Sequence, residues 1–351
     1  MSTFERFSEH EEAGRLLTAA LREGPAHAYL FHGPPGVGKR EVARTFARSL
    51  LGTDREFHAD LYELDALGEM IRIDAIRELR RDLHMRPFEA DRRVYLIQRA
   101  HLLNDDAADA LLKDLEEPPP YAVIVLVADD LGPIPETIRS RCQLVPFRRL
   151  SERAVRELVD ARAPQLADTE RAALARVAAG RLDRLERVLD PSSRARREAL
   201  LDAARAPYLD ERFDPSEAAA IVVANAQARG AEAREIEEGR IGELDLSSRD
   251  AEQRVKRAAR GAEREELLAQ LEELAAWYRD LVAVAVGADD AAIHLDKLAE
   301  LRADATRERI LGAEGAAEAV RELWRELEEL NLAPQLALEA LFVRIARELA
   351  A

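Results

Sequence analysis

Short, continuous apolar runs alternate with amphipathic segments in the first part of the chain. The apolar runs stand at residues 28–31, 94–97 and 122–127, and a weaker candidate stands at 144–147. The AVIVLV run at 122–127 is β-branched and uncharged, as a strand covered on both faces should be. Between the runs, apolar residues recur at helical spacing. The alternation predicts an α/β fold for residues 1–150, with a parallel sheet flanked by helices.

The pattern then changes, and only helical spacing remains to the end of the chain. Residues 151–206 are expected to form a small helical unit, and residues 207–351 a second, larger one, with Pro207 and Pro215 marking a linker. The stretch at about 227–266 is dense in Ala, Arg and Glu, which favours a solvated helical arm or a partly disordered insertion. An apolar seam follows this stretch and must pack on another helix; its members are Leu267, Leu271, Leu274, Tyr278 and Leu281.

Composition and charge exclude several classes of protein. With 52 Lys and Arg against 68 Asp and Glu, the net charge is -16, which argues against a protein that coats DNA by bulk charge. A single cysteine, Cys142, excludes an internal disulfide and any multi-cysteine zinc site. No stretch approaches the roughly 20 apolar residues that cross a bilayer, and no signal peptide is recognisable, so we expect a cytoplasmic protein with no membrane partner.

A glycine-rich segment follows the first apolar run and precedes a helical pattern. Its sequence, GPPGVGK at residues 33–39, matches the first seven positions of a phosphate-binding loop. The glycines Gly33, Gly36 and Gly38 let backbone N–H groups converge on phosphate oxygens, and Lys39 adds a full positive charge. The alternative is a glycine-rich turn that only closes a strand–helix corner.

Three positions that such a loop needs for hydrolysis carry the wrong side chain. Arg40 replaces the Ser or Thr that binds Mg²⁺, and a guanidinium cannot ligate a cation. Gln98 and Arg99 follow the second strand where an acidic pair is required. We therefore predict no ATP hydrolysis, no metal and no required cofactor at this site. Three alternatives remain for this site. The arginines could replace the charge of the metal, so that nucleotide or phosphate binds without a metal. The loop could instead stay empty behind a salt bridge to Asp129 or Asp130, or the arginines could simply face solvent.

Two segments resemble the clamp-loader branch of the AAA+ ATPases. Residues 108–119, ADALLKDLEEPP, are similar to a conserved helix of that family, and residues 137–142, TIRSRC, match its Ser-Arg-Cys motif. The resemblance is strong over about residues 5–150 and continues weakly to the C-terminus. It implies an AAA+ P-loop domain at 1–150, a helical lid at 151–206 and a helical collar for oligomerisation at 207–351.

Within that branch, a Ser-Arg-Cys motif beside a broken nucleotide site is similar to delta-prime subunits of the DNA polymerase III clamp loader. The resemblance implies that Arg141, flanked by Ser140 and Cys142, acts as an arginine finger on ATP bound by a neighbouring tau/gamma subunit. Pairing of Arg141 with a local acid such as Glu136 is the alternative. Relatives often carry a four-cysteine zinc module that residues 51–57 lack, so we predict no zinc.

The resemblance implies a function in DNA replication, as one subunit of a hetero-oligomer. The partners would be the tau/gamma and delta subunits, and indirectly the sliding clamp and primer–template DNA, within a DNA-directed DNA polymerase assembly. By the same resemblance, Asp183 stands where the lid's second sensor arginine is usual. Two alternatives stay open: a catalytically active ATPase of tau/gamma type, and a degenerate AAA+ adaptor that works outside replication.

Overall fold

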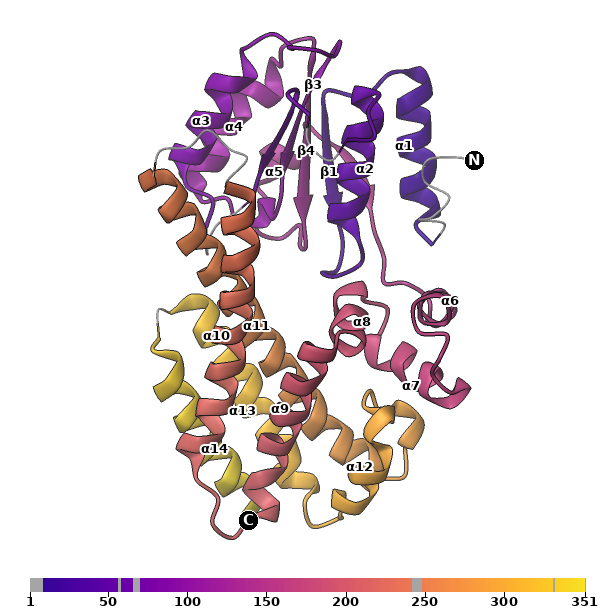
Figure 1. The fold of residues 1–351 in the computed structure, drawn as a ribbon, viewed down its shortest axis with the longest axis vertical. Coiled ribbons are helices and arrows are strands. Elements are labelled where there is room, and N and C mark those ends of the chain that lie inside the picture. Colours follow the sequence, from indigo (N-terminus) through magenta and orange to yellow (C-terminus); the bar gives the residue numbers. More distant parts are fainter. Residues whose placement is uncertain (1–8, 56–57, 66–69, 242–247, 331, 351) are drawn as a thin grey trace. The chain divides into compact units, whose positions relative to one another are not determined.

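The computed structural model describes residues 9–350 apart from 56–57, 66–69, 242–247 and 331. The chain divides into two compact units (Figure 1), of which the first comprises Met1–Ala154 with Gly180–Asp183, and the second Val155–Ala179 with Arg184–Ala351. The predicted division into three domains, with boundaries at residues 150 and 206, is not tested by this division into two units and stays a prediction. No helix in the described parts of the chain is long and apolar enough to span a membrane.

The first unit is built on a parallel sheet whose described strands run in the order β2-β3-β4-β1-β5. This is the α/β arrangement that the apolar runs predict. The strands are β1 (Ala28–His32), β2 (Leu61–Leu64), β3 (Arg93–Ile97), β4 (Ala122–Ala128) and β5 (Gln143–Pro146). Its helices are α1 (Glu11–Glu23), α2 (Lys39–Leu51), α3 (Ile73–Leu83), the short 3-10 helix η2 (Ala100–Leu102), α4 (Asp105–Glu116) and α5 (Glu136–Arg139).

Alternating side chains of the central strands feed two hydrophobic cores, one on each face of the sheet. Leu30 and Ile124 belong to the core under α3 and α4, whereas Phe31 and Val125 belong to the core under α1 and α2. Figure 1 shows these two helix pairs on opposite faces. Because β1 is buried on both faces, the loop that follows it starts from a fixed point.

All described secondary-structure elements of the second unit are helices, and two of them begin within residues of the first unit. Its elements are α6 (Glu152–Arg162), α7 (Asp168–Ala178), α8 (Leu182–Leu189), α9 (Pro191–Leu209), α10 (Pro215–Ile241), α11 (Ser248–Ala285), η3 (Asp289–Ala291), η4 (Leu295–Lys297), α12 (Leu298–Asp304), α13 (Ile310–Glu329) and α14 (Pro334–Ala350). The apolar seam predicted at Leu267–Leu281 lies in its core, around the buried Trp277 and Phe342.

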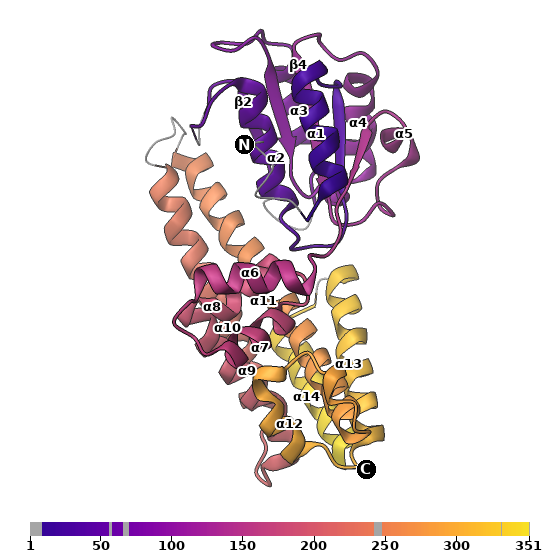
Figure 2. The ribbon, with the colours of Figure 1, turned by 90° about the vertical axis from the view of Figure 1, so that its right-hand side faces the viewer.

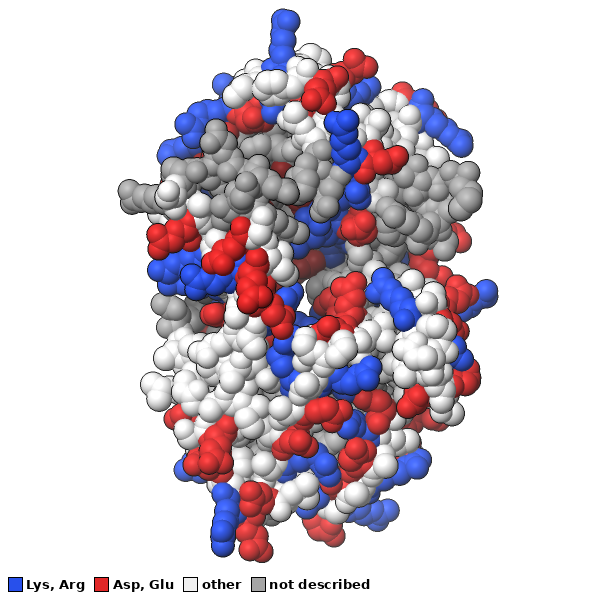
Figure 3. Space-filling view, in the orientation of Figure 1, with Lys and Arg blue, Asp and Glu red and all other residues white. Residues whose placement is uncertain are grey.

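The charged stretch at 227–266 is helical on both sides of residues 242–247, which lie outside the described part. It forms the end of α10 and the start of α11, which pack along each other (Figures 1 and 2). An ion pair between Arg254 and Glu237 joins the two helices. On the face shown in Figure 3, acidic and basic side chains are interspersed over the second unit.

The linker expected between Pro207 and Pro215 is shorter than predicted. Pro207 lies inside α9, two residues before its end, and Pro215 begins α10. A proline in the last turn of a helix costs only one hydrogen bond, and Ala203 and Ala204 just before it are buried in the core. The helix therefore continues, and the connection shrinks to residues 210–214.

Candidate functional site

The glycine-rich loop lies between β1 and the start of α2, as the sequence predicts. Gly33, Gly36 and Gly38 all have positive φ angles, of 141°, 71° and 91°. At Gly33 a side chain is also excluded by space, since a Cβ there would lie 2.2 Å from the carbonyl oxygen of Phe147. The loop therefore has the backbone geometry of a phosphate loop, held against the strand at the edge of the sheet.

Lys39 opens α2 and is almost fully buried, with 4% of its surface exposed. Its ammonium group donates to the carbonyls of Gly33, at 2.7 Å, and Pro34, at 2.5 Å. It also pairs with the carboxylate of Asp129 at 2.7 Å. Burial lowers the pKa of Lys39, and Asp129 works in the opposite direction. All three donors of the ammonium are thus engaged within the chain, and one of them makes the Asp129 salt bridge that the sequence offered as an alternative.

The residues that replace the magnesium ligands converge on two carboxylates at the end of β2. Arg40 and Arg99 both pair with Asp65, at 3.0 Å and 2.9 Å. The buried Gln98 donates to Glu63 at 2.9 Å. Arg40 is 46% exposed and Arg99 21% exposed, so Arg40 faces solvent as well as pairing with a carboxylate, whereas Arg99 is largely covered.

These side chains do not fit a magnesium ion. Mg²⁺ requires oxygen ligands in near-octahedral geometry, yet Arg40 and Arg99 carry only hydrogen-bond donors. The carboxylates nearby are already neutralised, since Glu63 also binds Arg44 at 2.9 Å. Sequence reasoning missed Glu63 and Asp65; their signal was two acidic residues at the carboxyl end of a short strand, the position at which parallel sheets place functional groups.

A second segment, Gly180–Asp183, contacts the loop and belongs to the same unit. The backbone N–H of Leu182 donates to the carbonyl of Gly36 at 2.7 Å. The carboxylate of Asp183 lies directly against Gly36, so that a Cβ on this glycine would be 1.8 Å from Oδ1. Arg181, which is 8% exposed, pairs with Asp183 at 2.7 Å. Asp183, which stands in the sequence where the second sensor arginine is usual, thus lies against the phosphate loop.

The Ser-Arg-Cys motif lies between α5 and β5. Arg141 donates to the carbonyl of Thr137 at 2.8 Å and pairs with Glu116, at the end of α4, at 2.5 Å. Its local acid is therefore Glu116 and not the expected Glu136. The Ser140 hydroxyl donates to the carbonyl of Thr137 at 3.2 Å.

Cys142 is a packed side chain. It lies against the hydrophobic core under α3 and α4, and burial raises the pKa of its thiol to about 12. A thiol that stays protonated at neutral pH is a poor nucleophile. Of the three motif residues, Arg141 is the one whose charge is available at the surface, with 34% of its side chain exposed.

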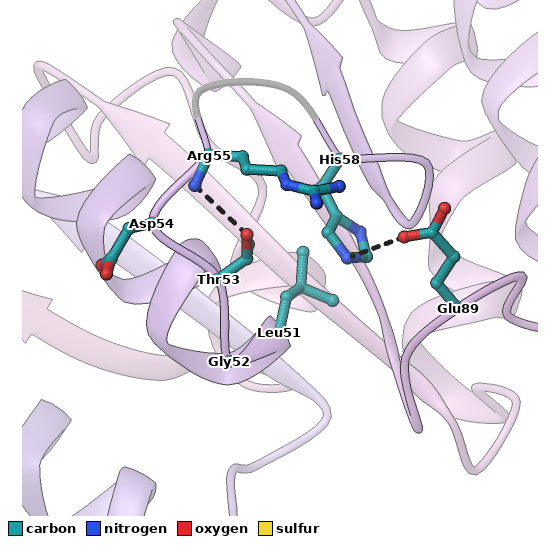
Figure 4. A pocket seen from close by; sticks show the side chains of 7 residues that line it. All are labelled: Leu51, Gly52, Thr53, Asp54, Arg55, His58 and Glu89. Atoms are coloured by element: carbon teal, nitrogen blue, oxygen red, sulfur yellow. Dashed lines mark hydrogen bonds and ion pairs between the residues drawn. The ribbon is translucent and has the colours of Figure 1, made fainter.

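The segment at residues 51–57, for which we predict no zinc module, contributes described residues to a hollow (Figure 4). Leu51, Gly52, Thr53, Asp54 and Arg55 form it together with His58 and Glu89, whose side chains are 3.8 Å apart. Residues 56–57 of this segment lie outside the described part. Among the described residues, no three His, Cys, Asp or Glu side chains are grouped so as to hold a metal ion. The absence of zinc stays a prediction.

Comparison with known proteins relates the first unit to subunits of a DNA polymerase. Residues 9–151 match the family described as "DNA polymerase III, delta subunit". DNA polymerase III subunit tau of Bacillus subtilis is 34% identical over 157 residues, which are 40% of this chain and 28% of that protein. Subunit gamma/tau of Mycobacterium tuberculosis is 33% identical over 178 residues, 45% of this chain and 31% of that protein.

A solved structure, a DNA polymerase III gamma subunit-related protein from Thermotoga maritima, is 18% identical with a TM-score of 0.48, covering 97% of this chain and 100% of its own. The chain spans only about a third of the length of the curated relatives it matches. The strong match thus coincides with the unit that holds the phosphate loop and the Ser-Arg-Cys motif. Over residues 9–151, the chain is therefore similar to the family described as "DNA polymerase III, delta subunit", and it is similar to tau and gamma/tau subunits of DNA polymerase III.

Proposed function

We propose that this protein is a non-hydrolysing clamp-loader subunit of delta-prime type, which donates Arg141 as an arginine finger to ATP bound by a neighbouring tau/gamma subunit. In this role it helps to load the sliding clamp onto primed DNA as a fixed member of a cytoplasmic hetero-oligomer with tau/gamma and delta subunits. The observation that carries the proposal is the contrast between its two sites. The cations at the phosphate loop are engaged in internal ion pairs, whereas Arg141 is partly exposed and its carboxylate partner, Glu116, is exposed as well.

The surroundings of Arg141 suit a side chain that changes partners. Glu116 is 49% exposed, and an ion pair at such a position contributes only about 0–1 kcal/mol. A phosphate with several negative charges would therefore outcompete it readily, since guanidinium groups bind phosphate oxygens in bidentate fashion. Arginine fingers raise the rate of hydrolysis by about 10³–10⁵. The free-energy cost of breaking the Arg141–Glu116 pair is small beside the lowering of the barrier that such a rate increase represents.

The side chains around the chain's own loop support the lack of hydrolysis. Lys39 has all three donors engaged, and Arg40, Gln98 and Arg99 replace every residue that would hold or use Mg²⁺. An active site of this class relies on a metal ion to bridge the β- and γ-phosphates. We expect the purified chain to show no magnesium-dependent ATP turnover.

The test is reconstitution of the complex with tau/gamma and delta subunits and measurement of its DNA-stimulated ATPase rate. Arg141→Ala should lower the rate by about 10³-fold or more while assembly is unchanged. Arg141→Lys keeps the charge but loses the bidentate geometry and should recover only a minor part. Arg22→Ala, at an exposed position on α1, is the matched control and should behave as wild type.

An ATPase rate that is unchanged in Arg141→Ala would remove the finger. The names of the relatives favour one second candidate, a catalytically active subunit of tau/gamma type, which requires ATP turnover by this chain alone. A failure to assemble with tau/gamma and delta would instead favour an adaptor outside replication. Each result therefore points to a different function.

A further inference from the structure

The carboxylate of Asp183 lies directly against the glycine-rich loop at Gly36. The space into which a Cβ on Gly36 would project is taken by Asp183, whose Oδ1, Cγ and Oδ2 would lie 1.8, 2.4 and 2.9 Å from that atom. Glycine is used in phosphate loops so that an anion can approach the backbone closely. Here the anion at that distance is a side chain of the same polypeptide.

Main-chain contacts of two residues that precede Asp183 help to fix it in this place, one at Gly180 and one at Leu182. Gly180 adopts a positive φ of 77° and its carbonyl accepts a hydrogen bond from Leu150 at 3.0 Å. The N–H of Leu182 donates to the carbonyl of Gly36 at 2.7 Å. A Cβ on Gly38 would lie 3.2 Å from the side chain of Leu182, which closes the loop further. The position of Asp183 is thus set by main-chain contacts that do not depend on its own charge.

The charges around the loop are balanced without a ligand. Lys39 pairs with Asp129, and Arg181 pairs with Asp183. Two cations and two carboxylates make a neutral set, so an incoming anion meets no excess positive charge. An incoming anion must also compete for cations that are nearly buried, with Lys39 at 4% and Arg181 at 8% exposed. The carboxylates that pair with them, Asp129 and Asp183, are 38% and 42% exposed.

We propose that Asp183 is the resident anion of the phosphate loop, and that it closes a latent, magnesium-independent polyphosphate site. Removal of this carboxylate leaves Arg181 and the loop amides for the β- and γ-phosphates of a nucleotide. The proposal rests on the proposed function in one respect, the loss of the magnesium ligands. It adds a reason why the loop of this subunit would not bind a nucleotide that carries no Mg²⁺.

The test is calorimetric titration of the full chain with ATP in the presence of EDTA. Wild type should bind weakly or not measurably. Asp183→Ala should bind at least tenfold more tightly, and Asp183→Asn, which keeps the shape and removes the charge, should show a smaller gain. Asp74→Ala is the matched control, because it removes an equally charged carboxylate that is 85% exposed on α3. It should behave as wild type.

Each outcome decides the proposal. The proposal is overturned if wild type and Asp183→Ala bind ATP with equal affinity. It is also overturned if neither Asp183→Ala nor Asp183→Asn binds ATP while both keep the circular dichroism and thermal midpoint of wild type. A gain shared by Asp74→Ala would mean that net charge alone is responsible, and would also overturn it. Magnesium-dependent turnover by wild type would instead contradict the proposed function, which the Arg141→Ala experiment tests separately.

Discussion

The helical unit contains a fully buried histidine whose charge makes its stability depend on pH. His294 follows η3, and its Nδ1 lies 2.8 Å from Asp280 while its Nε2 lies 3.1 Å from Glu273, both on α11. Its ring packs edge-on against Trp277 at 5.5 Å. Replacement by glutamine, His294→Gln, removes the charge but keeps hydrogen-bonding capacity.

The magnitude follows from the protonation equilibrium of this group. Burial by itself lowers the pKa of His294, but Glu273 and Asp280 outweigh it and raise the pKa from 6.5 to about 9, with Arg197 opposing them. Because the folded-state pKa is the higher one, the charged form stabilises the fold fully below about pH 6.5, and this contribution is lost as the pH rises through about 9. A shift of this size corresponds to about 3 kcal/mol.

The carboxylates act in a different pH window. Burial opposes ionisation of Glu273, but His294 and Arg197 lower its pKa, and His294 likewise lowers the pKa of Asp280 against the effect of burial. Their contribution to stability is therefore lost only as the pH falls through those lowered values. It does not interfere with a measurement between about pH 6 and pH 9.

The assay is urea unfolding at several pH values, followed by tryptophan fluorescence. Both tryptophans, Trp277 and Trp324, lie in the second unit, so the signal reports on this unit alone. The difference in unfolding free energy between wild type and His294→Gln should shrink by about 3 kcal/mol from pH 6 to pH 9. His84→Gln, an exposed position in the first unit, should follow wild type. Parallel curves for wild type and His294→Gln would refute the reasoning, because His294 would then be uncharged when folded.

Two further predictions concern the phosphate loop, and both can be read from hydrogen exchange of the β1 and β4 amides in the first unit. Gly36→Ala should destabilise this unit by about 1–2 kcal/mol because of the positive φ, and by a further ~1–3 kcal/mol because the new Cβ overpacks against Asp183. The control Gly52→Ala, with a φ of 64° but open space around it, should cost only the first amount. Equal costs for the two variants would mean that Asp183 moves away from the new Cβ without cost. Gln98→Glu should destabilise the unit by about 3 kcal/mol, less at pH 5 than at pH 8, because it buries a second carboxylate beside Glu63; a stability that does not change with pH would contradict the contact.

The sequence predicts the parts of the site that depend on local pattern. Continuous apolar runs gave β1, β3 and β4, because strands buried on both faces need uninterrupted hydrophobic residues. The glycines and Lys39 predict a phosphate loop from spacing alone.

What the sequence did not predict depends on register and on contacts between distant segments. The strand β2 is a short edge strand carrying Glu63, and it lacks the apolar run that marks its neighbours. Its pairing with β3 places Leu64 opposite Ile97, and this register brings Glu63 and Asp65, the neighbours of Leu64, to Gln98 and Arg99. In the same way, no local pattern reveals that Asp183 lies against Gly36, since 147 positions of sequence separate them.

These contacts explain why single substitutions would not restore a magnesium site. Arg40→Thr alone leaves Arg99 on Asp65, so the cation that occupies the carboxylate remains. Gln98→Asp alone faces Glu63, and Arg99→Glu alone faces Asp65, which in each case sets two carboxylates together without a metal to hold them. Residues that share a partner do not change independently. The replaced ligands and the acidic residues at the end of β2 therefore stabilise one another as a set, and we expect that several of them must change at once before the loop can hold Mg²⁺.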